Sequence, residues 1–144
     1  MSATEVEGPG VSRLLIFGGQ LAVALVWLYE GLVAKLIGLR EDERQIIASV
    51  PLLPDGWEGG LVWLIGGLEV LLALWVIIGW LPRLAAAVQT LILIIFNTGG
   101  LLFGSDRIPD PLHLIVTNVS FLALVWLVAS SLTHRADRSP HRHA

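Results

Sequence analysis

Four long apolar runs dominate this sequence, and each is long enough to cross a lipid bilayer. A spanning helix needs about 20 mainly apolar residues, and the runs cover 14–36, 61–81, 84–103 and 111–132. Lipid offers the backbone no hydrogen-bond partner, and the runs lack the alternation of a barrel strand, so each is expected to be helical. The sequence therefore predicts an all-α membrane protein, a four-transmembrane-helix bundle.

Composition agrees with this class and excludes several others. The 144 residues are 55% hydrophobic and 15% charged, whereas a soluble domain has about 25% charged residues. A nucleic-acid-binding protein needs a basic face, and the few charges here form none. With no cysteine, the chain cannot be a disulfide scaffold, a thiol enzyme or a cysteine-ligated metal protein.

The four spans divide the chain into three parts. Residues 1–12 are polar, acidic and rich in glycine and proline, and we expect them to be a disordered lead. Residues 13–132 form the transmembrane domain. Residues 133–144 form a basic tail that holds three of the four histidines. Because a tail supplies no rigid geometry, we expect a solvated segment there and no metal site.

The connectors differ in length and character. Pro82-Arg83 predicts a tight turn between the second and third spans. The first connector, 40–60, is long, and negative charge at Glu41-Asp42-Glu43 favours a helix start there. Apolar residues follow, and Pro51 would stop the helix. We expect a short amphipathic helix at the membrane surface, with an irregular loop as the alternative.

Four spans place both termini on one side of the membrane. That side carries five arginines and the other carries four basic residues, and such an excess favours the cytoplasm. The chain is therefore expected to be a multi-pass protein with cytoplasmic termini. The five arginines are Arg13, Arg83, Arg135, Arg138 and Arg142.

Polar residues inside the spans fall at similar depth. A helix rises about 1.5 Å per residue, so residue counts from the connectors give each depth. Every span places one polar group in the half that faces the first connector. These groups are Glu30, Glu69, Asn97 and Asn118, with His113 near the mouth of the layer and Lys35 between the layer and the surface.

The spacing of residues along each helix predicts which of these polar groups face a neighbouring helix. Glu69 shares a seam with Gly66 and Ala73, and Asn97 shares one with Gly100 and Gly104. Small residues on a seam let membrane helices approach closely, and Gly100 with Gly104 forms a GxxxG pair. Glu69 and Asn97 are therefore expected to face neighbouring helices. The partner of Asn118 is left open, and we expect His113, Thr117 and Ser120 to share another face.

The carboxylates are the strongest functional candidates in this layer. Interhelical hydrogen bonds contribute only about 0.6 kcal/mol on average, which is enough to explain the amides and hydroxyls as structural. An acidic group at the bilayer centre costs about 2.5–3.5 kcal/mol to insert. Glu30 and Glu69 should therefore be neutral, paired or facing water. Lys35, five residues after Glu30, is not its neighbour on an α-helix, and we expect it to extend to the interface.

The segment Trp27-Leu28-Tyr29-Glu30-Gly31-Leu32-Val33-Ala34-Lys35-Leu36 resembles the opening helix of DoxX-like membrane proteins. Weaker matches are Gly66-Gly67-Leu68-Glu69, Gly79-Trp80-Leu81-Pro82-Arg83, and Asp110-Pro111 leading to Asn118. The likeness runs from Val11 to Ser131. Relatives often have Asn-Pro and a Lys-Asn pair in the last span, where this chain has His113 and Thr117-Asn118.

The resemblance implies a four-helix protein of the bacterial cytoplasmic (inner) membrane. It implies no catalytic residues, so we expect no intrinsic catalytic activity. Some relatives are membrane subunits of a thiosulfate:quinone oxidoreductase or of redox-defence assemblies, which suggests a quinone as the small molecule. The candidate ligand-binding residues are Trp27, Tyr29, Glu30, Lys35, Glu69, Asn97, His113 and Asn118.

Three functions remain open at this point. The first is an accessory subunit whose polar layer binds a quinone-like headgroup in a mostly apolar cavity. The second is a scaffold that recruits a soluble oxidoreductase partner. The third, a small transporter or proton pathway through Glu30 and Glu69, ranks last because the two halves show no inverted repeat. The partners expected are the lipid bilayer and no nucleic acid, with a homo-oligomer left open.

Overall fold

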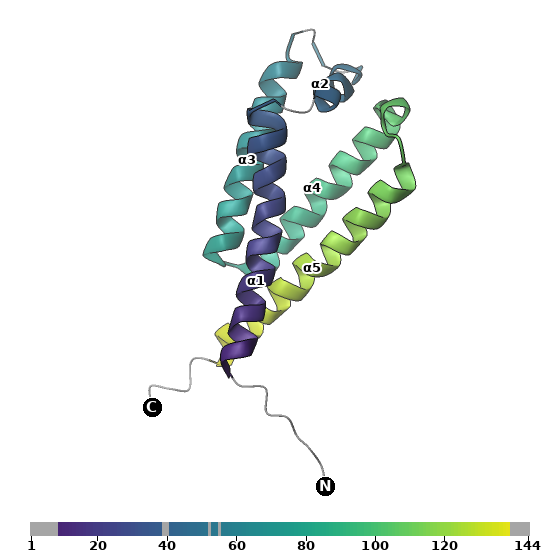
Figure 1. Ribbon diagram of the computed structural model, residues 1–144. Coiled ribbons are helices and arrows are strands. Elements are labelled where there is room, and N and C mark those ends of the chain that lie inside the picture. Colours follow the sequence, from purple (N-terminus) through teal and green to yellow (C-terminus); the bar gives the residue numbers. More distant parts are fainter. Residues whose placement is uncertain (1–8, 39–40, 52, 55, 139–144) are drawn as a thin grey trace.

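The computed structural model describes residues 9–38, 41–51, 53, 54 and 56–138, and every regular element in these ranges is a helix. Four helices are long and apolar enough to span a membrane, as the sequence predicts. Figure 1 shows them as an elongated bundle. In chain order the elements are α1 (Pro9–Leu28), the π-helix η1 (Tyr29–Leu36), α2 (Glu41–Ala48), α3 (Glu58–Ile78), α4 (Pro82–Phe103), the 3₁₀ turn η2 (Ser105–Arg107) and α5 (Pro111–Arg138).

Both ends of the helical region extend beyond the expected span limits. Helix α1 begins at Pro9, inside the predicted lead, because proline is well tolerated in the first turn of a helix. Helix α5 continues to Arg138, so the first half of the predicted tail is helical. Residues 1–8 and 139–144, which include His141 and His143, lie outside the described residues.

The turn between α3 and α4 lies earlier than the sequence predicts. Gly79 follows the last residue of α3 with φ 70°, and its N–H donates to the carbonyls of Trp75 and Val76 at 3.1 Å each. Glycine adopts this left-handed conformation without steric cost, so the helix ends there. Pro82 is the first residue of α4 and not part of the turn. Proline suits that position because its fixed φ is helical and its missing N–H would have no partner.

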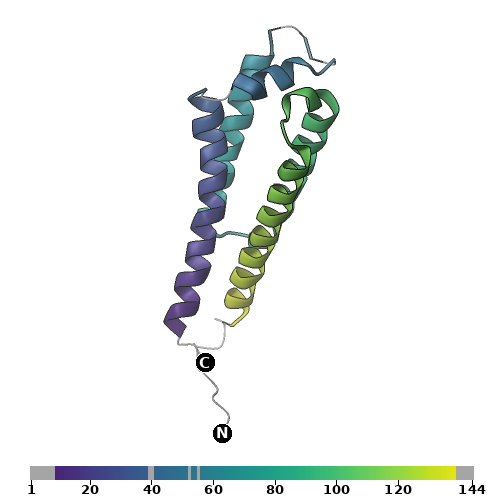
Figure 2. The same ribbon diagram turned by 45° about the vertical axis from the view of Figure 1, so that its right-hand side comes forward.

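The helices form two hairpins that meet at one end of the molecule. Helix α1 with η1 packs along α3, α4 packs along α5, and α1 also contacts α5. Figures 1 and 2 show the two hairpins close together where α1 begins and α5 ends, and farther apart toward α2. The buried apolar core lies at the end where the hairpins meet and comprises Val23, Ala24, Trp27, Leu72, Ala73, Val76, Ala86, Val125, Val128 and Ala129.

Helix α2 confirms the short amphipathic segment expected in the first connector. Ile46 and Ile47 are half-buried, whereas Arg44 and Gln45 are exposed. The helix contacts both α3 and α4, so it bridges the two hairpins at the end where they diverge. The bridge includes a polar contact, because Arg107 of η2 donates from Nη1 to Ser49 Oγ at 2.8 Å.

The glycine pair at the end of α4 faces connector segments and not another span: Gly104, which follows the last residue of α4, lies against α2, and Gly100 lies against the connector to α5. A Cβ on Gly104 would lie 2.7 Å from Ile46 Cγ1, and a Cβ on Gly100 would lie 3.5 Å from Ile108 Cδ1. The expectation that Gly100 and Gly104 face a neighbouring membrane helix is therefore wrong. The pair falls at the end of α4, where the nearest partners are the connector segments. The Gly66, Glu69 and Ala73 seam of α3 is confirmed, since all three are buried.

Candidate ligand site

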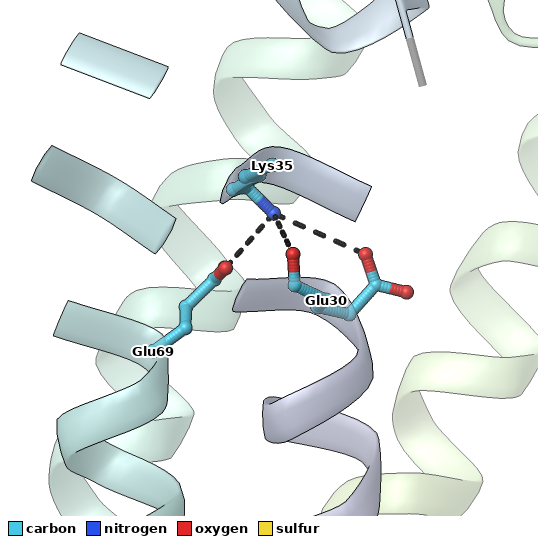
Figure 3. A network of polar contacts seen from close by, with 3 residues as sticks. All are labelled: Glu30, Lys35 and Glu69. Atoms are coloured by element: carbon cyan, nitrogen blue, oxygen red, sulfur yellow. Dashed lines mark hydrogen bonds and ion pairs between the residues drawn. The ribbon is translucent and has the colours of Figure 1, made fainter. Parts of the chain in front are cut away.

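Three charged side chains meet between η1 and α3. Lys35 Nζ lies 3.0 Å from Glu69 Oε2 and 3.9 Å from Glu30 Oε2. It also lies 3.5 Å from the backbone carbonyl of Glu30, to which it donates. Figure 3 shows the ammonium between the two glutamates, with Glu69 on one side and the Glu30 carboxylate on the other. The structure thus brings together three of the predicted site residues, which we call the charged cluster.

The π-helix η1 explains how Lys35 reaches Glu30. Its wider turn is closed by hydrogen bonds between residues five apart, and the Ile37 N–H donates in this way to the Leu32 carbonyl at 2.8 Å. Residues at positions i and i+5 therefore lie above one another. On an α-helix Lys35 would point away from Glu30, and the prediction that the two residues are not neighbours is wrong because this segment is a π-helix.

Two glycines hold η1 against α3 at the height of the cluster. A Cβ on Gly31 would lie 2.6 Å from the Gly66 carbonyl oxygen, and a Cβ on Gly66 would lie 2.9 Å from the Gly31 carbonyl oxygen. Only residues without a side chain permit this approach of the two backbones. The same approach places Lys35 Cβ 3.0 Å from the position of a Cβ on Gly66. The backbone contact thereby sets the distance between Lys35 and Glu69.

Lys35 does not extend to the membrane interface, contrary to the prediction. Its side chain is 7% exposed, and the ring centroid of Phe96 from α4 lies 6.0 Å from Nζ. A lysine extends outward when the interior offers it no counterion, but here Glu69 lies within reach on the adjacent helix. Lys35 is therefore an interior ion-pair partner. Sequence reasoning did not find Phe96, whose one signal is that it directly precedes Asn97.

The two glutamates differ in accessibility. The Glu69 side chain is 3% exposed and lies next to the midpoint of α3. Its contact with Lys35 through Oε2 is an ion pair without hydrogen-bond geometry. The Glu30 side chain is 33% exposed. In Figure 3 its second oxygen points away from Lys35, toward the side of the bundle where α4 and α5 lie. Glu30 is thus the member of the cluster that a small molecule could reach.

Asn97 and Asn118 form the polar contact of the other hairpin. Asn118 Nδ2 donates to Asn97 Oδ1 at 2.7 Å, and both side chains are half-buried between α4 and α5. The sequence placed both residues in the layer but could not name the partner of Asn118. The contact shows that Asn97 faces a neighbouring helix, as predicted.

Trp27 belongs to the packing core. It is 2% exposed, its ring contacts Phe121 edge-on at 6.0 Å, and its Nε1 donates to Gln89 Oε1 at 2.8 Å. Gln89 is itself buried and donates to the Ala85 carbonyl at 3.1 Å. Trp27 and Gln89 therefore connect α1 to α4 through a buried hydrogen bond.

Tyr29 and His113 face outward. Tyr29 is 53% exposed. His113 lies in the first turn of α5 with an exposed side chain, and its backbone N–H donates to Asp110 Oδ1 at 2.9 Å. Thr117 and Ser120 share that exposure. The structure thus does not bring the predicted site residues Tyr29 and His113 to the charged cluster.

Comparison with known proteins agrees with this architecture. Residues 24–126 match the DoxX-like family, and this range contains the charged cluster, the asparagine pair and most of the four spans. No match was found among curated proteins or among solved structures. Because the matching range covers well over half of the sequence, the chain belongs to the DoxX-like family.

Proposed function

We propose that this protein is an accessory subunit of a membrane redox system and binds a small, quinone-like molecule without catalysing a reaction itself. The observation that carries the proposal is the charged cluster inside the spans, in which Lys35 Nζ lies 3.0 Å from Glu69 Oε2 and 3.9 Å from Glu30 Oε2. The site would take a ligand with an apolar body and a hydrogen-bonding headgroup.

The stability of helix packing does not by itself account for these charges inside the bundle. A buried ion pair is often no more stabilising than apolar residues of the same volume, because both ions lose their hydration. Near the cluster, the contact of η1 with α3 is made by small residues such as Gly31 and Gly66. The one other buried polar side chain described between α1 and α3 is the uncharged Gln20, whose Nε2 donates to the Val76 and Ile77 carbonyls. Ionisable residues inside a membrane domain more often mark a binding or transport site.

The surroundings fit an amphiphilic ligand. Glu30 is partly exposed on the side of the bundle where α4 and α5 lie, and Phe96 of α4 is near Lys35. A quinone-like ring could pack against apolar and aromatic side chains while its oxygen atoms meet the polar groups. The same proposal includes the bacterial inner membrane and a soluble oxidoreductase as the redox partner, both of which rest on the resemblance. It also includes cytoplasmic termini, which rest on the excess of arginines on that side of the membrane.

Direct titration tests the proposal. The purified protein in detergent is titrated calorimetrically with a decyl-substituted benzoquinone and its hydroquinone, with empty micelles as the blank. We expect saturable binding of at least one form, and loss of binding in the double variant Lys35→Met/Glu69→Gln. This variant neutralises both members of the buried pair and so leaves no single buried charge. Binding that survives in the double variant, or no binding in the wild type, would contradict the proposal.

A further inference from the structure

Two side chains of α2 contact the second hairpin at the end of the bundle where the hairpins diverge. A Cβ on Gly104 would lie 2.7 Å from Cγ1 and 3.0 Å from Cγ2 of Ile46, so this isoleucine fills the space beside the glycine. Ser49 Oγ accepts from Arg107 Nη1 at 2.8 Å. Ile46 and Ser49 are three residues apart and therefore lie on one face of α2. We call these two contacts the latch.

Each half of the latch is held together by its own hydrogen bonds. The Ser49 hydroxyl donates to the Gln45 carbonyl at 2.8 Å, inside α2. On the other side, the Arg107 N–H donates to the Gly104 carbonyl at 3.0 Å, so one turn carries both partners of α2. The two halves can therefore separate without loss of these internal hydrogen bonds.

The buried apolar core joins the two hairpins at the opposite end of the molecule. It contains residues of both hairpins, such as Val23 of α1, Ala73 of α3 and Val125 of α5. Figures 1 and 2 show the hairpins closest at that end and farther apart toward α2. The core is thus placed as a hinge, and the latch is placed where it limits the separation of the hairpins.

The charged cluster lies between the hinge and the latch. Along the chain, Lys35 falls between the core residue Trp27 and the start of α2 at Glu41. Its side chain is 7% exposed, and the ring centroid of Phe96, from the other hairpin, lies 6.0 Å from Nζ. Separation of the hairpins would therefore carry Phe96 away from Lys35.

We propose that α2 is a latch that controls access to the charged cluster. While the latch is closed, Glu30 is the accessible member, at 33% exposed against 7% for Lys35 and 3% for Glu69. When the latch parts, the hairpins separate about the core, and Lys35 becomes accessible from the α2 end. This inference goes beyond the proposed function, because it concerns the opening of the bundle and holds for any small molecule that enters it.

A disulfide between α2 and Gly104 would lock the latch, and the chain has no cysteine of its own. Both Cγ atoms of Ile46 are bonded to its Cβ, so the Cβ positions of residues 46 and 104 lie close to the separation of about 3.5–4.5 Å that a disulfide joins. We expect Ile46→Cys/Gly104→Cys to cross-link on mild oxidation in detergent micelles, measured as the loss of free thiols. Failure to cross-link would overturn the contact that carries the proposal.

Lys35 reports the opening directly, because it is the only lysine in the sequence. The protein in micelles is treated with the N-hydroxysuccinimide ester of acetic acid at fixed pH. Peptide mass spectrometry gives the acetylation rate of Lys35, with the α-amino group as the internal reference. The locked protein should react at least about tenfold more slowly than the wild type, because a disulfide stabilises the closed state. Ile46→Ser/Gly104→Ser cannot cross-link and is the matched control, which should react at least as fast as the wild type.

The opposite change removes the latch. Ile46→Ala/Ser49→Ala deletes both contacts and should raise the acetylation rate of Lys35 about tenfold, the effect of one lost hydrogen bond together with lost apolar contact. Gln45→Ala, on the exposed side of α2, is the matched control and should leave the rate unchanged. Equal rates in the locked, wild-type and latch-deleted proteins, including no acetylation in any of them, would overturn the proposal. Since no quinone is used, this result is independent of the titration that tests the proposed function.

Discussion

Gly31 and Gly66 lie backbone to backbone across the contact between η1 and α3. A Cβ on either residue would come within 2.9 Å of the carbonyl oxygen of the other. This reciprocal contact fixes the distance between the backbones that carry the charged cluster. Lys35 follows Gly31 by about one turn, and Glu69 follows Gly66 by about one turn. The spacing of the two backbones therefore sets the spacing of the ion pair.

Gly66→Ala should destabilise the protein. The added methyl group would meet the Gly31 carbonyl and Lys35 Cβ, so η1 must move away from α3. We expect a loss of about 1–3 kcal/mol in the free energy of unfolding, typical of overpacking. Gly67→Ala is the matched control, since no atom lies within 4 Å of its Cβ position. Thermal unfolding of both variants in detergent gives the comparison, and equal midpoints would show that η1 and α3 are not in close contact.

Lys35→Met should destabilise the protein more than the double variant Lys35→Met/Glu69→Gln does. The single variant removes the ammonium that lies 3.0 Å from the buried Glu69 carboxylate, and breaking a buried pair in this way costs about 3–5 kcal/mol. The double variant removes the remaining charge as well and should recover most of the loss. Urea unfolding in mixed micelles measures the difference. Glu69→Gln alone completes the comparison. If the loss in the double variant equals the sum of the losses in the two single variants, the pair is not coupled.

The hydrogen bond between Asn97 and Asn118 should appear as a measurable coupling between α4 and α5. A double-mutant cycle with Asn97→Leu and Asn118→Leu should give about 0.6 kcal/mol, the average for interhelical hydrogen bonds in membrane proteins. A second cycle that pairs Asn97→Leu with Thr117→Val should give no coupling, because Thr117 is exposed. A zero value in the first cycle would argue against the 2.7 Å contact.

Gln89→Leu should lower stability by about 1–3 kcal/mol, because it leaves the indole N–H of Trp27 buried without its acceptor. Thr98→Val, an exposed position on the same helix, is the control and should have little effect. Thermal unfolding followed by far-UV circular dichroism gives the comparison. An unchanged midpoint for Gln89→Leu would contradict the assigned hydrogen bond.

The topology is testable because the chain has no cysteine of its own. Ser49→Cys and Ser105→Cys lie at the α2 end of the bundle, and His134→Cys lies in the last turns of α5 at the opposite end. A membrane-impermeant thiol reagent applied to intact cells should label the first two and spare the third if the termini are cytoplasmic. Labelling of His134→Cys alone would reverse the orientation, and labelling of all three from one side would contradict four spans.

The sequence by itself determined the four spans, the all-helical class and the amphipathic connector helix. Each follows from properties that are local along the chain: the length of an apolar run, the absence of backbone partners in lipid, and the phase of a few residues. Helical phase also predicted correctly that Glu69 and Asn97 face neighbouring helices, since phase depends only on position within one helix.

The tertiary structure decided which of these groups meet. The partner of Asn118 and the pairing of Lys35 with Glu69 depend on the packing of separate helices, which no local pattern specifies. The position of Lys35 depends further on a change of helix type, because η1 places residues five apart above one another. The sequence marked Glu30 and Glu69 as costly charges but predicted that Lys35 extends to the interface. Only the approach of Gly31 to Gly66 brings the three residues into one cluster.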